Sequence, residues 1–342
     1  MKTKTMSLKM NCLVAASAVL VGCGGGGGGG AASGGAAQAP APAPAPASVS
    51  LITNPAVPAA TVDPEAIAGF KKLISEREHC GFGKLNWNPQ LAVAATGHAD
   101  WQLINAFKGH YQTTGTPGFT GVEFSDRYIA AGYAAPFVGT DEITSMLGSN
   151  DKNGEGVNGV KRLLSAPYHA LGLLDGYVDV GIAVRNITDA GSNKNPRVVV
   201  QINPAYKVAT GPQKPDASVL IRTYPCQGTT GTAYQLVNET PNPIPGRDLA
   251  ANPIGQPIMI ESPVKDAQLV ITSASVIPSG GSQIALLSTL TNASDANGII
   301  KANQAVLMPN LPLATSTVHS VSIAGTVNGT SFTRNFTFTT GN

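Results

Sequence analysis

Apolar residues follow two different rhythms along this chain of 342 residues. Between residues 63 and 174 they recur every three or four positions, which is typical of amphipathic helices. Beyond residue 215 they alternate with polar residues in short runs that Gly, Pro, Asn and Ser separate, which is typical of β-sandwich strands. We therefore predict an α+β domain over residues 61–210 and an all-β domain over residues 215–342.

Prolines mark three helix starts in the first domain. Pro64, Pro89 and Pro167 suit the first helical position, where the missing N–H of proline needs no partner. Asp63 and Asn88 precede two of these prolines and can accept hydrogen bonds from the free amides of the first turn. The sequence thus predicts helices that begin at all three prolines.

The helix from Pro89 has an apolar or small face formed by Leu91, Ala94, Ala95, Trp101 and Ile104. His98 lies on the same face, and we predict a core histidine whose ring is satisfied by hydrogen bonds. Gly109 is expected to end this helix, because glycine accepts the left-handed geometry of a helix stop. His110 would then lie in a loop, free to point into a cleft, while His169 falls in the opening turn of the helix from Pro167.

Further elements complete the pattern. Helices are predicted over residues 125–132, with Ser125 as the cap, and over residues 157–164. Two strands follow, over residues 178–184 and 198–202. In the second domain, strands are predicted for the alternating runs at residues 219–221, 268–271, 318–323 and 332–338.

Two polar features are expected to have little functional weight. Asp126 and Arg127 are predicted to form an exposed or local ion pair, which contributes little to stability. His319 lies in an alternating run without other candidate catalytic residues, so we expect a surface or cross-strand position.

The first 23 residues carry an export signal. Three lysines precede the apolar run from Cys12 to Gly22, which is too short for a membrane span of roughly 20 residues. Leu20-Val21-Gly22-Cys23 resembles a bacterial lipobox, which implies a signal peptide over residues 1–22 and a lipid on Cys23. The alternative is an ordinary signal peptide with a free thiol at Cys23. Residues 23–60 are rich in Gly, Ala and Pro and are predicted to be a tether.

This export signal sets the expected compartment and partners. We expect the mature chain in a bacterial cell envelope, lipid-anchored on the periplasmic or surface side of the outer membrane. Removal of the signal's three lysines leaves 19 basic residues against 20 acidic ones, so no basic excess remains to bind nucleic acid. We expect a monomer.

The four cysteines suggest one disulfide bond. Cys12 lies in the signal and Cys23 is the predicted lipid site, which leaves Cys80 and Cys226. An even pair in an exported chain favours a disulfide, and two buried thiols are the alternative. Neither cysteine belongs to a Cys-x-x-Cys unit, so a zinc site on this pair is disfavoured.

Several motifs resemble one known family. The segments "LNWNPQLAVAATGHADW", "GHY", "DRYIAAGY", "DEI" and "LLSAPYH" resemble, in order and spacing, the CAP superfamily, also called SCP or cysteine-rich secretory protein domains. The resemblance implies an α-β-α sandwich whose central cleft is lined by His110, Glu142 and His169. A second glutamate of some members has no acidic counterpart near Ser165. The C-terminal segment resembles the Ig-like domain that often follows bacterial CAP domains.

This cleft leaves three kinds of chemistry open. Two neutral imidazoles and a carboxylate can hold zinc or another divalent metal, with a position left for water. The same residues without metal can perform acid–base chemistry near neutral pH, or they can form a hydrogen-bonded network that shapes the cleft. We predict an envelope binding module for a lipid, glycan, peptide or protein ligand. The alternative is a metal-assisted hydrolase that uses His110, Glu142 and His169.

Overall fold

The computed structural model describes residues 47–189, 192–215 and 218–342. The described residues belong to one compact unit with mixed α and β structure, which confirms the predicted α+β content. The predicted signal peptide, Cys23 and most of the tether lie outside the described residues. Within the described ranges, no helix has the length and apolar character that would let it cross a bilayer.

A five-stranded sheet forms the centre of the first region. Its strands run in the order β2 (Asn86–Trp87), β5 (Asp179–Asn186), β6 (Val198–Lys207) and β3 (Phe137–Gly139), and β4 (Glu142–Met146) also pairs with β6. The long antiparallel pair β5 and β6 contains both strands predicted from the sequence. The short strands β2, β3 and β4 were not predicted, because none of them is a sustained alternating run.

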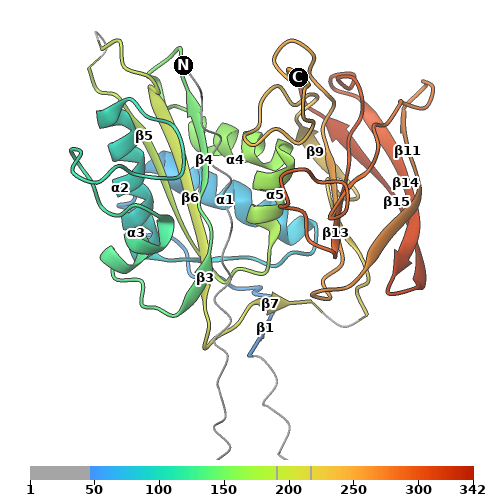
Figure 1. Cartoon of the computed structure of the whole chain (residues 1–342), viewed down its shortest axis with the longest axis horizontal. Coiled ribbons are helices and arrows are strands. Elements are labelled where there is room, and N and C mark those ends of the chain that lie inside the picture. Colours follow the sequence, from blue (N-terminus) through green and yellow to red (C-terminus); the bar gives the residue numbers. More distant parts are fainter. Residues whose placement is uncertain (1–46, 190–191, 216–217) are drawn as a thin grey trace, which may run out of the picture. The chain divides into compact units, whose positions relative to one another are not determined.

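Helices cover both faces of this sheet (Figure 1). One face carries α1 (Pro64–His79), α4 (Glu155–Ser165) and α5 (Pro167–Leu174). The other carries α2 (Pro89–Asn105) and α3 (Phe124–Ala130). The first region is therefore built as helices, sheet and helices in three layers.

Alternation along β6 explains why both faces are covered. Val200 and Ile202 join the core beneath α1, α4 and α5, whereas Val199 packs with residues of α2. Successive strand side chains point to opposite faces, and residues 198–203 are all buried, Gln201 and Asn203 with hydrogen bonds, so each face needs a covering layer. At Gly181 of β5 a Cβ would lie 2.0 Å from the backbone nitrogen of Ala92, so the close approach of α2 requires glycine there.

The predicted helix starts are confirmed. Asp63 caps α1 through a hydrogen bond from the Glu65 amide to its Oδ1 (2.9 Å). Asn88 caps α2, because its Oδ1 accepts hydrogen bonds from the two amides of the first turn at 3.0 and 3.1 Å. Helix α5 begins at Pro167, as predicted.

Two helix boundaries differ from the prediction. Helix α2 ends at Asn105 rather than at Gly109, and Ala106 takes the left-handed conformation with φ of 52°. The side chain of Asn105 donates hydrogen bonds to the carbonyls of Trp101 and Pro117, which fix this earlier turn. Ile104, predicted to face inward, is 44% exposed.

Helix α3 begins two residues earlier than a cap at Ser125 predicts. Its cap is Glu123 rather than Ser125, and the amide of Glu123 donates to Oδ2 of Asp126 (3.1 Å). Asp126, the third residue of the helix, thus gives the amide of Glu123 a hydrogen-bond partner, and Ser125 is not needed as the cap.

The folded part begins before residue 61, where the predicted tether was to end. Strand β1 (Val49–Ser50) pairs in parallel with β7 (Gln213–Lys214). The amide of Trp87 donates to the carbonyl of Ala56 (2.8 Å). The tether prediction is therefore wrong for residues 49–60, because apolar residues of this segment find backbone partners on the folded region.

The C-terminal region contains two four-stranded antiparallel or mixed sheets. One has the order β12 (Leu290–Thr291), β13 (Gln304–Leu307), β10 (Ile258–Glu261) and β8 (Arg222–Tyr224). The other has the order β11 (Leu269–Pro278), β14 (Val318–Val327), β15 (Thr330–Thr340) and β9 (Thr229–Thr232). The two sheets share an apolar core that includes Ile260, Ile323 and Phe336.

Three of the four predicted strands of this region lie within β11, β14 and β15. The hairpin between β14 and β15 turns at Asn328 and Gly329, both at positive φ, as an Asn-Gly turn requires. The fourth prediction is wrong, because residues 219–221 precede β8 and form no strand.

The two regions do not exchange strands within the described ranges, but they share one core. Met259 and Tyr224 of the β region belong to the same apolar cluster as Leu73 of α1 and Leu171 of α5. The predicted disulfide between Cys80 and Cys226 is present, with Cα atoms 5.5 Å apart. It joins the end of α1 to the residues after β8.

Candidate functional site

The structure brings His110, Glu142 and His169 together from three elements. His110 lies in the loop after α2, Glu142 is the first residue of β4, and His169 lies in the first turn of α5. The two imidazole rings stack at a centroid distance of 6.2 Å with 28° between their planes. The His110 side chain is 41% exposed and that of His169 is 15% exposed, so both imidazoles reach solvent.

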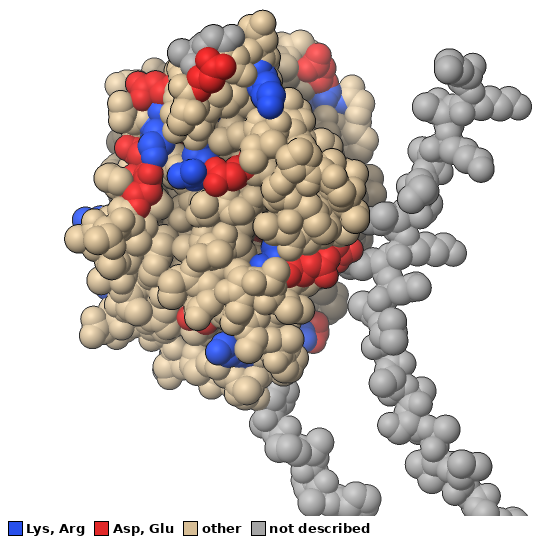
Figure 2. Space-filling view, turned by 90° about the vertical axis from the view of Figure 1, so that its left-hand side faces the viewer, with Lys and Arg blue, Asp and Glu red and all other residues tan. Residues whose placement is uncertain are grey.

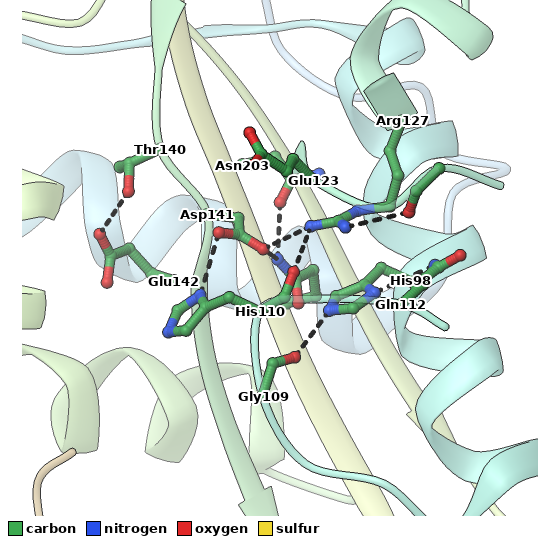
Figure 3. A network of polar contacts seen from close by, with 12 residues as sticks. His98, Gly109, His110, Gln112, Glu123, Arg127, Thr140, Asp141, Glu142 and Asn203 are labelled. Carbon is green, nitrogen blue, oxygen red and sulfur yellow. Dashed lines mark hydrogen bonds and ion pairs between the residues drawn. The ribbon is translucent and has the colours of Figure 1, made fainter. Parts of the chain in front are cut away.

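Each imidazole is held by its own buried carboxylate. Nδ1 of His110 lies 3.0 Å from Oδ1 of Asp141, and Nδ1 of His169 lies 2.5 Å from Oε2 of Glu142. Asp141 and Glu142 are consecutive, so their side chains point to opposite faces of the sheet. In Figure 3, Asp141 turns toward His110 and Arg127, whereas Glu142 turns the other way, toward Thr140. Since both Nδ1 atoms are engaged, the two Nε2 atoms are the ones left for a ligand.

Arg127 secures the His110 half of the site. It is 1% exposed, and its Nη2 donates to Oδ2 of Asp141 (2.8 Å) and to the carbonyl of His110 (3.0 Å). The prediction of an exposed or local Asp126–Arg127 pair is therefore wrong. Arg127 is buried because Asp141 neutralises its charge and backbone carbonyls, including that of Val122 (3.0 Å), accept its other protons.

The charges around Asp141 favour an ion pair with His110. Burial raises the pKa of Asp141, but the hydrogen bond from His110 and the charges of His110 and Arg127 outweigh it, so the pKa lies below its usual range. Burial lowers the pKa of His110, but its hydrogen bond to Asp141 and the carboxylate charges raise the pKa above its usual value. The His110 half thus favours a charged imidazolium and a charged carboxylate.

The His169 half has no arginine. Burial raises the pKa of Glu142, and the hydrogen bond and charge of His169 offset this only in part, so the pKa stays above its usual range. Burial lowers the pKa of His169, but Glu142 outweighs burial and the pKa is raised. Both partners therefore hold a proton more readily than usual.

His98 lies apart from the cleft, as predicted for a core histidine. It is fully buried, its Nε2 lies 2.9 Å from the carbonyl of Gly109, and its Nδ1 lies 3.1 Å from Nε2 of Gln112. A carbonyl only accepts, so Nε2 carries the proton and Nδ1 accepts from the amide. Burial and the charge of Arg127 together lower the pKa of His98 to about 4. His98 therefore stays neutral and holds the loop that carries His110.

The three-ligand metal set predicted from the sequence is not formed. Among the described residues, no group of three or more His, Cys, Asp or Glu side chains is arranged to hold a metal ion. Glu142 lies at Nδ1 of His169, on the far side of the ring from Nε2, and its other oxygen accepts from the hydroxyl of Thr140 (3.2 Å). Glu142 thus orients a histidine and does not join the two Nε2 atoms as a third ligand.

Three residues at this site were not predicted from the sequence. Asp141 is the first residue of the "DEI" motif, so its position next to Glu142 could have identified it as a site residue. Arg127 carried no local sign of burial. Glu239 comes from the β region, between β9 and β10, and its Oε1 accepts hydrogen bonds from the amides of Tyr168 (2.7 Å) and His169 (3.4 Å). No local pattern marks a contact over 70 residues of sequence.

His319 is a buried cross-strand residue rather than a surface one. It lies on β14 opposite Phe338 of β15, and the two rings stack at 5.2 Å. Its Nδ1 lies 2.9 Å from the carbonyl of Thr317, and the residue is fully buried. The predicted cross-strand position is confirmed. The predicted surface position is wrong, because the His319 side chain is buried and stacks on Phe338.

Comparison with known proteins defines no family for this chain. No protein-family model and no curated protein matches it. Among solved structures, it is similar to an outer surface protein from Borrelia burgdorferi, with 16% sequence identity and a TM-score of 0.32. That match covers 42% of this chain and 92% of the other protein. A likeness at this level carries no argument about function.

Proposed function

We propose that this chain is an exported, lipid-anchored protein of the CAP superfamily that serves the bacterial cell envelope as a binding module. One observation carries the binding role. Two partly exposed imidazoles stand side by side, each fixed at Nδ1 by a buried carboxylate, and each with Nε2 left to meet a ligand. Fixed ring orientation is what a binding site needs, because little freedom is then lost when the ligand arrives.

The ligand group is an oxygen acceptor, best a carboxylate or a phosphate. Both histidine pKa values are raised, so near neutral pH each ring tends toward the imidazolium form, in which Nε2 donates. Charge-assisted hydrogen bonds to an anionic oxygen are stronger than neutral ones. Tyr111 follows His110 in the loop and is 53% exposed, so an aromatic ring is available next to His110 in the chain. Lipid, glycan, peptide and protein ligands all carry suitable oxygens.

The family part of the proposal is supported by the layered sheet and by the proximity of His110, Glu142 and His169, with the two rings stacked and Glu142 bonded to His169. The two packed sheets of the C-terminal region support an Ig-like domain as its companion. Charged side chains are scattered on the face formed by α2 and α3 (Figure 2), which suits a ligand other than nucleic acid.

The anchor is tested by Cys23→Ala in the full chain. The lipobox-like residues before Cys23 motivate the expectation that the wild-type protein fractionates with membranes and that the variant is released. Equal membrane association of the two proteins would remove the anchor from the proposal.

The binding role is tested with inorganic phosphate and with acetate as probes. In NMR titrations at about pH 6, where imidazolium is populated, each probe should shift the ring protons of His110 and His169 in a saturable way. The double variant His110→Ala with His169→Ala should abolish the saturable shifts that the probes cause in the surrounding backbone amides, and His79→Ala should leave them unchanged, since His79 bonds to the carbonyl of Gln227 away from the site. Rings that do not respond to either probe would contradict the binding role.

The alternative of metal-assisted hydrolysis has no specific observation in its favour. Its third ligand, Glu142, is committed to Nδ1 of His169 and to Thr140. The proposal therefore stays with binding.

A further inference from the structure

The first turn of α5 is held by side chains from the β region. The residue before this helix, Ala166, has no side chain that can cap it. Glu239 supplies the missing cap, since its Oε1 accepts from the amides of Tyr168 and His169. The hydroxyl of Tyr168 in turn donates to Oδ1 of Asp295 (2.5 Å). Two carboxyl groups of the β region therefore fix the turn that carries His169.

Glu239 is unusual among the capping groups of this protein because it is buried. The residue is 5% exposed, and its Oε2 has no hydrogen-bond partner among the described residues. A buried carboxyl oxygen without a partner is costly, so its retention calls for a compensating role. Burial raises the pKa of Glu239 to about 8, against the opposing charge of His169 and the two amide donors. A neutral acid still accepts both amide protons through Oε1.

We infer that Glu239 is a positioning residue for His169, through which the C-terminal β region completes the binding site of the first region. The cap fixes the backbone of His169, and the backbone fixes the direction from which Nδ1 meets Glu142. Without the cap, two amides of the turn lose their partner and the turn frays. The 2.5 Å contact between His169 and Glu142 depends on that turn, because Glu142 is anchored separately on β4.

The inference rests on the proposed function only in taking His169 as a residue that faces the ligand. The groups that surround His169 are Glu142 from β4, Glu239 and Asp141, with the ring of His110 alongside. His110 has no contact with Glu239 and is held by Asp141 and Arg127. It therefore serves as an internal reference for any change at His169.

The test follows the Nδ1 protons of both histidines by NMR in the mature chain. A proton in a short hydrogen bond to a carboxylate gives a separate low-field signal while it is protected from exchange. Glu239→Ala removes the cap and should abolish the His169 signal through solvent exchange while the His110 signal persists. Glu239→Gln keeps an oxygen in the same place and should retain both signals. Glu239→Asp, which withdraws the carboxyl by one methylene, should weaken the His169 signal and serves if the alanine variant does not fold.

Three outcomes overturn the inference. In the first, the His169 signal of Glu239→Ala matches that of the wild type. If the alanine variant does not fold, the same result in Glu239→Asp counts. Both histidine signals could fade together, which would mean general loosening. Glu239→Gln could fail as the alanine variant does. Glu261→Gln removes another buried carboxylate of the β region, bonded to Arg222 (2.6 Å), and should leave the His169 signal unchanged. Phosphate titration of the same samples is a separate measurement, so a protein that binds no phosphate but shows the Glu239 effect would refute only the proposed function.

Discussion

The His110 half and the His169 half of the site hold their imidazole rings in different electrostatic surroundings. Each must fix an imidazole against a carboxylate that is almost fully buried, Asp141 at 4% and Glu142 at 5% exposure. The His110 half adds a guanidinium, so the pKa of Asp141 is lowered although burial raises it. The His169 half has no guanidinium, and the charges of His169 and His110 offset burial only in part, so the pKa of Glu142 stays raised.

The comparison teaches that burial alone does not decide the charge state of a carboxyl group. A permanent cation at 2.8 Å makes the first half an ion pair that persists over a wide pH range. In the second half the pKa values of both Glu142 and His169 are raised, and the backbone of His169 is supported from the β region through Glu239. The first half should therefore be robust to changes in the β region, and the second should be sensitive to them.

Arg127→Met should lower the free energy of unfolding more than any other variant proposed below, because it removes the guanidinium that only the His110 half has. Asp141 would remain buried without its cation, and breaking a buried pair in this way costs about 3–5 kcal/mol of unfolding free energy. Denaturant unfolding measures the loss. Arg185→Met is the matched control, since both side chains of its pair with Asp100 are partly exposed, and such a pair is worth about 0–1 kcal/mol. Equal losses for the two variants would show that Arg127 is not the support we describe.

Removal of the disulfide should cause the next largest loss of unfolding free energy. The double variant Cys80→Ser with Cys226→Ser opens a crosslink between residues 146 apart, which should lower the unfolding free energy by about 2–4 kcal/mol. The bond ties the β region to the end of α1, so its loss should loosen the His169 half before the His110 half. Hydrogen exchange of the two Nδ1 protons in the folded variant measures the order. Simultaneous loosening of both rings would argue against a separate dependence of His169 on the β region.

Local signals in the sequence located much of this fold. The helix starts at Asp63, Asn88 and Pro167 follow from capping and proline chemistry that involves only neighbouring residues. Strands β5 and β6 follow from sustained apolar runs. The early end of α2 was missed, because it depends on the carbonyl of Pro117, twelve residues further along the chain.

The site was only partly predictable for the same reason. His110, Glu142 and His169 were named through a family resemblance, and no local rule brings them together. Arg127 of α3 is buried only because Asp141, in the loop between β3 and β4, meets it, and Glu239 reaches His169 from a region predicted as a separate domain. Such contacts depend on tertiary structure, which hydrophobic periodicity does not encode.

Gly172→Ala should affect the His169 half alone. A Cβ at this position of α5 would lie 2.1 Å from Oε1 of Glu142, so the carboxyl group has to move away from Thr140 or from His169. Overpacking of this kind costs about 1–2 kcal/mol. The Nδ1 proton signal of His169 should shift while that of His110 stays. Gly148→Ala, where a Cβ meets nothing within 4 Å, is the control. An unchanged His169 signal in Gly172→Ala would mean that Glu142 can move without consequence.

The smallest effect should be the pH dependence of the free energy of unfolding. The carboxyl groups of the two halves contribute to it with opposite signs. A raised histidine pKa contributes stability that is complete below the unfolded value, near 6.5, and is lost as pH rises through the folded value. Asp141 has a lowered pKa, so its contribution is present above the unfolded value, near 3.8, and is lost as pH falls through the folded value. Glu142 has a raised pKa and therefore opposes stability once pH exceeds its unfolded value, near 4.5.

These signs predict that the unfolding free energy of the wild type declines above pH 4.5, through Glu142 and Glu239, and declines more steeply above pH 6.5, where the two histidines add to it. His169→Gln and His110→Gln should each flatten part of that decline, because glutamine keeps a donor to the carboxylate but does not titrate. On the acid side, only the His110 half should lose stability below pH 3.8, since Arg127 keeps Asp141 charged until then. Denaturant unfolding at half-unit steps of pH measures both limbs. A decline above pH 6.5 that persists undiminished in the double glutamine variant would show that other groups control it, and the contrast between the two halves would then rest on geometry alone.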